Sequence, residues 1–195
     1  MHPAEECVRS KIRLADERCA EGIRAIYAPI VESTVISFET TPPEAAEMAR
    51  RLRGVLETHP WIVCEGEDGI EGYAYGSTFN GRAAYDWSCE ASVYVASDSR
   101  GVGVGRRLYR ALLELLARQG YRQVCAGIRL PNVASVRLHE SFGFEPVAVY
   151  KKVGFKFGAW HDVGWWQLSL SPFDTAPELV EDLGKVCAAF DWNAC

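Results

Sequence analysis

The sequence predicts an α+β fold, in which one mixed β-sheet is flanked by helices within a single domain. The length of 195 residues suits one domain with a substantial core. The hydrophobic patterns follow the order β, α, α, β, β, β, α, β, α, β, β, which mixes hairpins with single helical crossovers. We expect the domain over residues 11–172, between an N-terminal extension (1–10) and a C-terminal extension (173–195) that is a weak helix or disordered.

The first half of the chain begins with a predicted strand at 11–14, where polar and apolar residues alternate. A helix then starts near Ala15–Glu17 and continues until Pro29 ends or bends it. Residues 34–40 are expected to form a loop or a short extended piece. A second helix opens at 41–44, with Thr41 as its cap and proline in its first turn. His59-Pro60 stops that helix.

The second half contains most of the predicted strands. Residues 61–65 and 70–76 form a hairpin around 66–69, and 85–96 is the next strand. A glycine-rich loop follows, and then a helix whose apolar face is lined by leucines and which ends near Gln119-Gly120. The remaining elements are a strand at 123–128, a short helix at 132–141, strands at 146–152 and 160–170, and a weak helical pattern at 176–190.

Composition excludes several classes of function. The formal net charge of −5 argues against a nucleic-acid partner, because phosphate contacts need a basic surface. No apolar run approaches the roughly 18 residues of a membrane span, and the first residues lack the layout of a signal peptide. The four histidines show no metal-ligand spacing, so no metal is expected.

The seven cysteines include no C-x-x-C pair. Three of them, Cys64, Cys89 and Cys125, lie inside predicted strands, where a free thiol behaves as a small hydrophobe. We therefore expect reduced core cysteines in a cytoplasmic protein. A nucleophilic role for Cys89 is the less favoured alternative.

The segment Arg100-Gly101-Val102-Gly103-Val104-Gly105-Arg106 lies between a strand and a helix. Glycines allow the backbone to approach a ligand, and the following helix directs its free N–H groups and positive dipole into the loop. With Arg100, Arg106 and Arg107 these features favour a phosphate or pyrophosphate site. A tight turn without a ligand is the alternative.

Two nucleotide motifs do not fit this segment. A P-loop needs lysine followed by serine or threonine, whereas Gly105 precedes two arginines. A dinucleotide fingerprint needs G-x-G-x-x-G, whereas the glycines here run G-x-G-x-G. The pattern Arg100-x-x-Gly103-x-Gly105 resembles the pyrophosphate loop of acetyl-CoA-dependent N-acetyltransferases of the GNAT superfamily.

A second segment, Asn132-x-x-Ser135-x-x-Leu138-His139, resembles another motif of this superfamily. There the asparagine contacts the cofactor arm, and the position seven residues later is often a tyrosine that protonates the leaving thiolate. This chain has His139 instead, and imidazole can also donate a proton. His139 is therefore a candidate general acid, with a satisfied structural histidine as the alternative.

Longer blocks resemble the phosphinothricin N-acetyltransferases, a group that includes enzymes for methionine sulfoximine. The resemblance covers residues 11–172, and its most specific blocks are Tyr85-Asp86-Trp87…Glu90-x-Ser92-Val93-Tyr94-Val95 and Trp160-His161-Asp162-Val163-Gly164. It implies a GNAT-like fold and transfer of acetyl from acetyl-CoA to the α-amino group of a small amino-acid analogue. The alternatives are a superfamily member that acts on protein N-termini or other amines, and a non-catalytic domain that binds acyl-CoA.

The resemblance also implies a cofactor site. The pyrophosphate is expected on the amides from Gly101 to Arg106, and the pantetheine arm beside Val93–Val95 as if it were an extra strand. A backbone N–H near Tyr94 or Val95 then faces the thioester oxygen. The expected cofactor-binding residues are Val93, Tyr94, Val95, Arg100, Gly101, Val102, Gly103, Val104, Gly105, Arg106, Asn132 and Ser135.

The resemblance implies that Glu90 is the general base. A carboxylate can accept the proton of an incoming ammonium, and burial between Trp87 and Tyr94 is expected to raise its pKa toward neutrality. The alternative is a glutamate that is bonded to a neighbouring strand or solvated.

An amino-acid substrate also carries an α-carboxylate, and Arg82 is the candidate to bind it. Phe38 and Tyr94 are the candidate walls of the side-chain pocket, with plain core packing as the alternative. His161 is interpreted as structural or interfacial. Many relatives form dimers, so we expect a homodimer.

Overall fold

Seven strands form one mixed sheet in the computed structural model, which describes residues 10–194. Apart from Ser10, the predicted N-terminal extension lies outside the described residues. The strand order is β1-β2-β3-β4-β5-β7-β6, and every neighbouring pair is antiparallel except β4 and β5. The sheet confirms the predicted α+β class. The strands are β1 (Lys11–Leu14), β2 (Trp61–Gly66), β3 (Gly69–Thr78), β4 (Ser88–Val95), β5 (Gln123–Leu130), β6 (Glu145–Lys156) and β7 (Ala159–Ser169).

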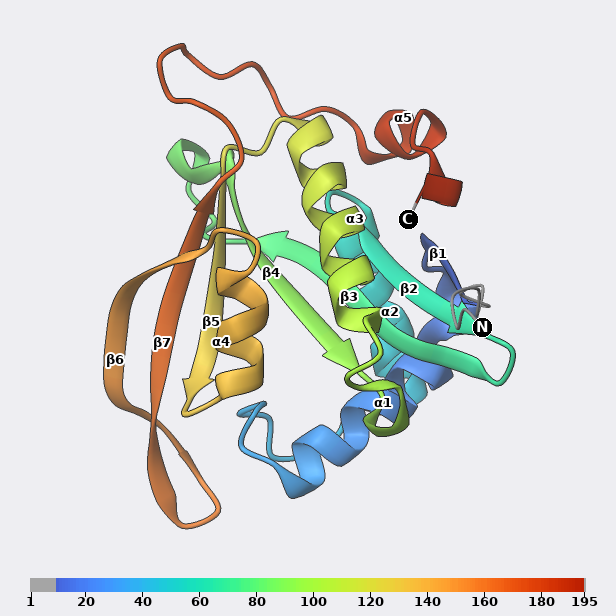
Figure 1. The fold of residues 1–195 in the computed structure, drawn as a ribbon, viewed down its shortest axis with the longest axis vertical. Helices are drawn as coiled ribbons and strands as arrows, with labels where there is room; N and C mark the ends of the chain where they lie inside the picture. The colour runs from blue at the N-terminus through green and yellow to red at the C-terminus, as the bar shows by residue number, and fades with distance from the viewer. Residues whose placement is uncertain (1–9, 195) are drawn as a thin grey trace, which may run out of the picture.

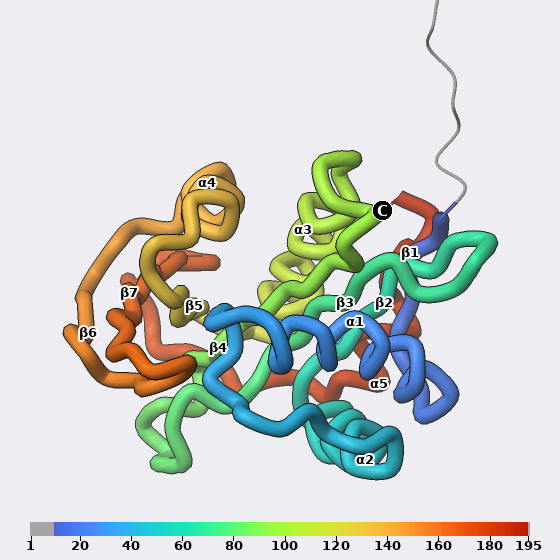
Figure 2. Tube along the Cα trace, turned by 90° about the horizontal axis from the view of Figure 1, so that it is seen from below, coloured from blue at the N-terminus to red at the C-terminus, as the bar shows by residue number. Residues whose placement is uncertain are grey.

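Helices cover both faces of the sheet. α1 (Ala20–Ser33) and α2 (Ala45–Leu56) lie on one face, and α3 (Val104–Gln119) and α4 (Val133–Glu140) lie on the other (Figure 2). Alternation along β2 explains this arrangement, because Ile62 and Cys64 join the core beside α3 while Trp61 and Val63 join the core beside α1 and α2. The predicted leucine face of α3 is fully buried, with 0% exposure at Leu108, Leu112, Leu115 and Leu116.

The sheet opens between its two parallel strands. β4 and β5 are in register only from Ser88–Glu90 to Gln123–Cys125. Beyond these pairs the strands diverge, as Figure 1 shows for the arrowheads of β4 and β5. Within residues 10–194, the β4 edge of 91–95 that faces β5 therefore has no strand partner. This edge keeps N–H and C=O groups available for a ligand.

Two predicted boundaries are wrong, and for a third boundary one of its two alternatives, the end of the helix at Pro29, is excluded. The strand predicted from Tyr85 begins at Ser88, because 83–85 form a short 3-10 helix. The second helix begins at Ala45 after Glu44, so Thr41 is not its cap. Pro29 lies inside α1, which continues to Ser33 because its last turn carries the buried Ile30 and Val31.

Buried lysine Lys156 fixes the loop between α1 and α2. Its ammonium donates hydrogen bonds to the carbonyl oxygens of Val31 (2.6 Å) and Ser37 (2.8 Å). The loop therefore lies against the β6–β7 hairpin, where Phe38 comes so close to Gly154 that a Cβ there would collide with its ring. Residues 34–40 form the predicted loop.

A second set of bonds holds the same loop from the opposite side. The Tyr27 hydroxyl lies 2.7 Å from Ser37 Oγ and donates to Glu39 at 2.8 Å. Arg51 binds both carboxylate oxygens of Glu39, at 2.7 and 3.1 Å. The loop that carries Phe38 is thus tied to α1, α2 and β6 together.

The C-terminal segment returns to the core. α5 (Leu183–Ala188) is shorter than the predicted helical stretch at 176–190, and it packs against α3. Leu183, Val186 and Phe190 are buried. Trp87 Nε1 donates to the carbonyl of Glu178 at 2.6 Å, which links this segment to the residues before β4.

The predicted core cysteines Cys64, Cys89 and Cys125 are buried free thiols. Burial raises the pKa of the Cys89 thiol far above its ordinary value, which argues against a nucleophilic role. Across residues 10–194, the structure holds no helix with the length and apolar character needed to cross a membrane.

Candidate active site

The glycine loop is open to a ligand at two positions. Gly101 (φ +80°) and Gly103 (φ +96°) have left-handed backbone conformations, and a Cβ on either would meet nothing within 4 Å. Gly103 is the N-cap of α3, and the first bond inside this helix is donated by the N–H of Arg107 to the carbonyl of Gly103. The N–H groups of Val104, Gly105 and Arg106 therefore remain available at the positive end of the helix dipole.

The three arginines of the loop divide into two groups. Arg100 stays beside the loop and donates from Nε to the carbonyl of Val95 at 3.2 Å. Arg106 is exposed and lies over the ring of Phe142, 5.5 Å from its centroid. Arg107 turns away and donates to Ser10 Oγ and O, both at 2.9 Å. The predicted contribution of Arg107 to the phosphate site is therefore wrong.

Strand β4 directs alternate side chains to the two faces of the sheet. Val93 and Val95 pack with the core beside α3, whereas Tyr94 packs with the core beside α1 and α2. The Tyr94 ring stacks on Tyr73 at 5.2 Å and meets Tyr27 edge-on at 5.3 Å. Because side chains alternate along a strand, Glu90 lies on the same face as Tyr94.

Glu90 is half-buried on β4, opposite Ser77 of β3 and Cys125 of β5. Among residues 10–194, no hydrogen-bond donor reaches its carboxylate. Burial raises the pKa of Glu90 above its ordinary value of 4.5. A carboxylate without stabilising donors, at the point where β4 and β5 begin to separate, is well suited to accept a proton.

Asn132 and Ser135 begin α4. Asn132 is the N-cap, and its Oδ1 accepts a hydrogen bond from the N–H of Ser135 at 3.1 Å. This bond orients the side chain and leaves its amide N–H groups for another acceptor. The geometry is compatible with the predicted contact to a cofactor arm.

His139 is buried on the inner face of α4. Its Nδ1 lies 2.7 Å from the carbonyl oxygen of Ser135, so Nδ1–H is the donor and Nε2 carries no proton in the neutral ring. The ring meets Tyr109 and Phe144 edge-on, and burial lowers its pKa. These contacts favour the structural alternative, and the role of general acid stays a prediction.

Phe38, a candidate from the sequence, packs against His161. Their rings stack at 6.1 Å between centroids. His161 Nδ1 accepts from Arg129 at 3.0 Å, because a guanidinium can only donate, and His161 Nε2–H then donates to the carbonyl of Lys156 at 3.0 Å. Both nitrogens are used, which supports the structural interpretation of His161. Arg82 is exposed on the loop before β4.

Comparison with known proteins decides the family. The model of the acetyltransferase (GNAT) domain matches residues 12–165. The chain belongs to the GNAT acetyltransferases. Membership makes it an N-acetyltransferase, and acetyl-CoA is its co-substrate. The open glycines, the free N–H groups of α3 and the gap between β4 and β5 are features that fit this co-substrate.

Relatives of this GNAT chain include enzymes with known substrates. It is 39% identical over 157 residues to a phosphinothricin N-acetyltransferase of Streptomyces viridochromogenes, which covers 80% of this chain and 86% of that one. It is 35% identical over 174 residues to an L-methionine sulfoximine/L-methionine sulfone acetyltransferase of Pseudomonas paraeruginosa (86% and 99%). The structure matches a phosphinothricin acetyltransferase from Sinorhizobium meliloti in complex with AcCoA, with a TM-score of 0.83, 35% identity and coverage of 87% and 94%.

The sequence analysis missed several residues that hold the Phe38 loop and His161 in place. Lys156, Tyr27, Glu39 and Arg51 fix the loop that carries Phe38, and Arg129 contacts His161. No local pattern marks these residues, since their partners are distant in sequence. Only the pairing of β5 with β7 brings Arg129 and His161 together.

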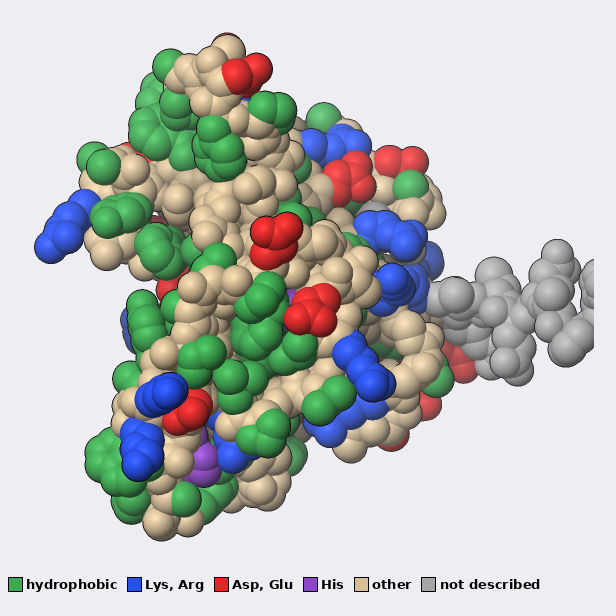
Figure 3. All heavy atoms as spheres, turned by 60° about the vertical axis from the view of Figure 1, so that its left-hand side comes forward, with side chains coloured by type: hydrophobic (Ala, Val, Ile, Leu, Met, Phe, Trp, Pro, Cys, Tyr) green, Lys and Arg blue, Asp and Glu red, His purple; other side chains and the backbone are tan. Residues whose placement is uncertain are grey.

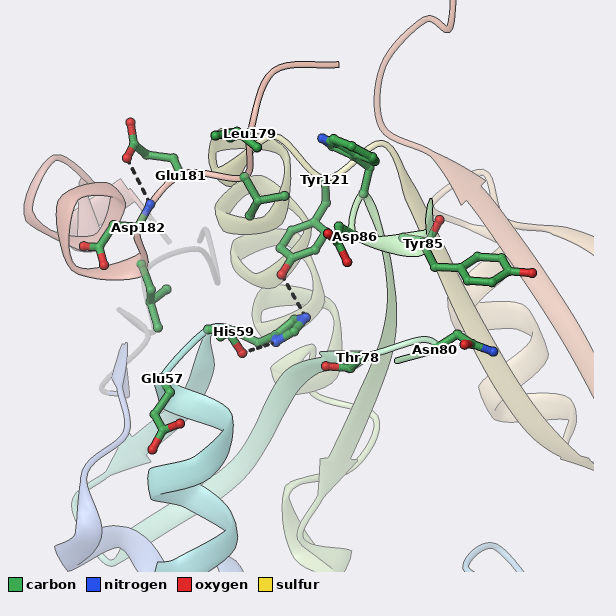
Figure 4. A pocket seen from close by; sticks show the side chains of 15 residues that line it. Glu57, His59, Thr78, Asn80, Tyr85, Asp86, Tyr121, Leu179, Glu181 and Asp182 are labelled. Atoms are coloured by element: carbon green, nitrogen blue, oxygen red, sulfur yellow. Dashed lines mark hydrogen bonds between the residues drawn. The ribbon is translucent and has the colours of Figure 1, made fainter. Parts of the chain in front are cut away.

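A pocket lies at the opposite end of β4 from the glycine loop. It has a volume of about 460 Å³, and Figure 4 shows Tyr121 pointing at the His59 ring within it. His59 Nε2 lies 2.9 Å from the Tyr121 hydroxyl, and Nδ1 lies 2.7 Å from Thr58 Oγ1. Burial lowers the pKa of His59 to about 4, so this histidine is neutral at pH 7.

Gly103→Asp in this GNAT enzyme tests the phosphate loop. A carboxylate at the N-terminus of α3 would repel the pyrophosphate, so we expect acetyl-CoA affinity to fall about tenfold or more in isothermal titration calorimetry. Gly158→Asp is the matched control, because Gly158 also has a positive φ (+74°) with open space around it. Unchanged affinity in Gly103→Asp would exclude this loop as the pyrophosphate site.

His59 is expected to make the enzyme less stable in acid. Its folded pKa of about 4 lies below the unfolded value of 6.5, so the unfolded state binds more protons between these values. The stability that neutral His59 provides is present above pH 6.5 and is lost as pH falls toward 4, by roughly 3 kcal/mol at full loss. The free energy of unfolding, measured by urea denaturation at pH 6.5 and at pH 4 for the wild type and for His59→Gln, tests this expectation. Equal pH dependence in the two proteins would contradict it.

Proposed function

We propose that this GNAT enzyme acetylates the α-amino group of a small amino-acid analogue such as L-phosphinothricin, methionine sulfoximine or methionine sulfone. The observation that carries the proposal is the half-buried, unbonded Glu90 at the opening between β4 and β5. The relatives of this chain include phosphinothricin and methionine sulfoximine/sulfone acetyltransferases, and these relatives support the proposed substrate class. Such an activity would confer resistance to toxic analogues of this kind.

The surface beside Glu90 offers contacts for each part of such a substrate. We assign the α-carboxylate to Arg82, whose exposed guanidinium can bind it through two hydrogen bonds. Phe38 and Tyr94 are the proposed walls of the side-chain pocket. The bonds from Tyr27 and Lys156 to Ser37 hold the Phe38 loop and support a preformed wall.

The proposed reaction is direct transfer. The backbone edge of Val93–Val95 holds the pantetheine arm, and an N–H near Tyr94 or Val95 polarises the thioester carbonyl. Glu90 takes a proton from the substrate ammonium, directly or through water. The amine nitrogen then bonds to the acetyl carbon as the carbon–sulfur bond breaks. The nitrogen gives up its second proton as the departing thiolate gains one. We assign this transfer to His139, whose neutral ring leaves Nε2 free to relay a proton.

A homodimer is part of the proposal. Strand β6 is the edge of the sheet, and its long side chains Val147, Val149, Tyr150, Val153 and Phe155 are each more than half exposed. Figure 3 shows apolar side chains gathered on this side of the molecule. An exposed apolar edge strand of this kind is suited to burial against a second copy. We place the enzyme in the cytoplasm, in agreement with its free buried thiols.

Acetyl-CoA-dependent thiol release tests the substrate class. The panel contains L-phosphinothricin, L-methionine sulfoximine, L-methionine sulfone, ordinary amino acids and short peptides. We expect release with the phosphinate, sulfoximine or sulfone compounds. Release with peptides alone would instead indicate an enzyme for protein N-termini. Binding of acetyl-CoA without release from any amine would indicate a non-catalytic domain.

Glu90→Gln is expected to lower kcat/KM by about 10²- to 10⁴-fold while acetyl-CoA still binds. Only the deprotonated carboxylate accepts a proton, and burial raises its pKa, so the acid limb of the wild-type profile should lie above pH 4.5. The Gln variant should lack that limb. Glu32→Gln, at an exposed position on α1, is the matched control. A pH profile in Glu90→Gln that matches the wild type would remove Glu90 as the base.

A further inference from the structure

Arg129 is a half-buried cation without an anionic partner in the part of the chain that the structure describes. Its guanidinium donates to the carbonyl of Pro131 at 3.4 Å and to His161 Nδ1 at 3.0 Å, and both of these acceptors are uncharged. Its Nε is buried and has no hydrogen-bond partner among residues 10–194. An uncompensated charge is unfavourable in a half-buried place, which suggests that the terminal nitrogens of this guanidinium receive an anionic acceptor from a ligand.

Arg129 lies on the face of the sheet that carries Glu90. Glu90 is in register with Cys125 of β5, and side chains two and four residues further along a strand share that face. Gly127, which lies between Cys125 and Arg129 on this face, has no side chain of its own, and the Trp165 indole from the paired position on β7 packs over it. The Cα atoms of residues 125 and 129 are separated by roughly 13 Å in an extended strand. The guanidinium of Arg129 turns toward His161 and Pro131, so a substrate that reaches from Glu90 to Arg129 would pass over the Trp165 ring.

The neighbours of Arg129 fix its position rather than neutralise it. His161 is held by its own bond to the Lys156 carbonyl and by stacking on Phe38. His161 therefore connects Arg129 to the loop that is proposed to form the substrate wall. A guanidinium held in this way still has N–H groups that can donate to a carboxylate, which is planar, or to a phosphinate, which is tetrahedral.

We infer that Arg129 binds the anionic side-chain group of the amine substrate, and that the site therefore prefers amino acids with an anionic side chain over neutral isosteres. This inference rests on the proposed function. Arg82 then serves the α-carboxylate, Glu90 the amino group and Arg129 a phosphinate or carboxylate at the far end of the substrate. Arg129 is thus a specificity residue, separate from the machinery of acetyl transfer.

Steady-state kinetics with two substrates test this role. L-Phosphinothricin carries an anionic phosphinate, whereas L-methionine sulfone has a neutral side chain. In Arg129→Met the ratio of kcat/KM for phosphinothricin to that for the sulfone should fall about tenfold to a hundredfold, mainly through KM of phosphinothricin. Arg129→Lys should retain part of the ratio. Arg110→Met, on the exposed side of α3, is the control and should leave the ratio unchanged.

The ratio separates recognition from structural support. If Arg129 only braces His161, both substrates lose rate equally and the ratio stays constant, which overturns the inference. If the ratio of kcat/KM values is unchanged in Arg129→Met while the wild type turns over these substrates, the inference fails and the proposed function is unaffected. Absence of turnover by the wild type with either compound overturns both proposals. If Arg129→Met does not fold, the ratio in Arg129→Gln decides, because glutamine keeps hydrogen-bond donors but no charge, and a wild-type ratio there contradicts the inference.

Discussion

The end of parallel pairing between β4 and β5 is the constraint on which the site depends. Three residue pairs join the strands, and after Glu90 and Cys125 they diverge. This divergence leaves the backbone edge of β4 unpaired, and β4 leads directly toward the glycine loop and α3. One geometric feature therefore aligns an unpaired strand edge, the proposed base Glu90 and the open N-terminus of α3. Continuous pairing would satisfy the same backbone groups internally and would leave no room for a thioester.

The Phe38 loop, which lies beside the proposed substrate site, is held in one position by its hydrogen bonds. Lys156, Tyr27 and Arg51 tie the Phe38 loop to three elements, so its position is set before a substrate arrives. Prior ordering of this kind reduces the entropy that binding must remove. The charged groups are also in place before a substrate arrives. The Glu90 carboxylate has no hydrogen-bond donor and the Arg129 guanidinium has no anionic partner among the described residues. Both groups are unfavourable alone, and in the proposed reaction a substrate with an ammonium and an anionic side chain compensates them.

Local patterns predicted the order of elements, the glycine loop and the position of Glu90 on a strand, because each depends on neighbouring residues. Long-range contacts were not predictable in this way. Arg107 turns toward Ser10, and Lys156 reaches carbonyls of Val31 and Ser37, more than a hundred residues earlier. The start of β4 was misplaced because apolar Tyr85 extends the pattern into a 3-10 turn. His139 was assigned from a motif, whereas its burial depends on packing against Tyr109 and Phe144.

The central claim is that acetyl-CoA occupies the opening between β4 and β5, with its pyrophosphate on the N-terminus of α3. Amide hydrogen exchange with and without acetyl-CoA measures this most directly. The account predicts slower exchange, on ligand binding, at the amides of Val93–Val95 and of residues 102–106, with little change around His59. Unchanged exchange at both of these segments, with protection instead around the pocket of His59 and Tyr121, would contradict it.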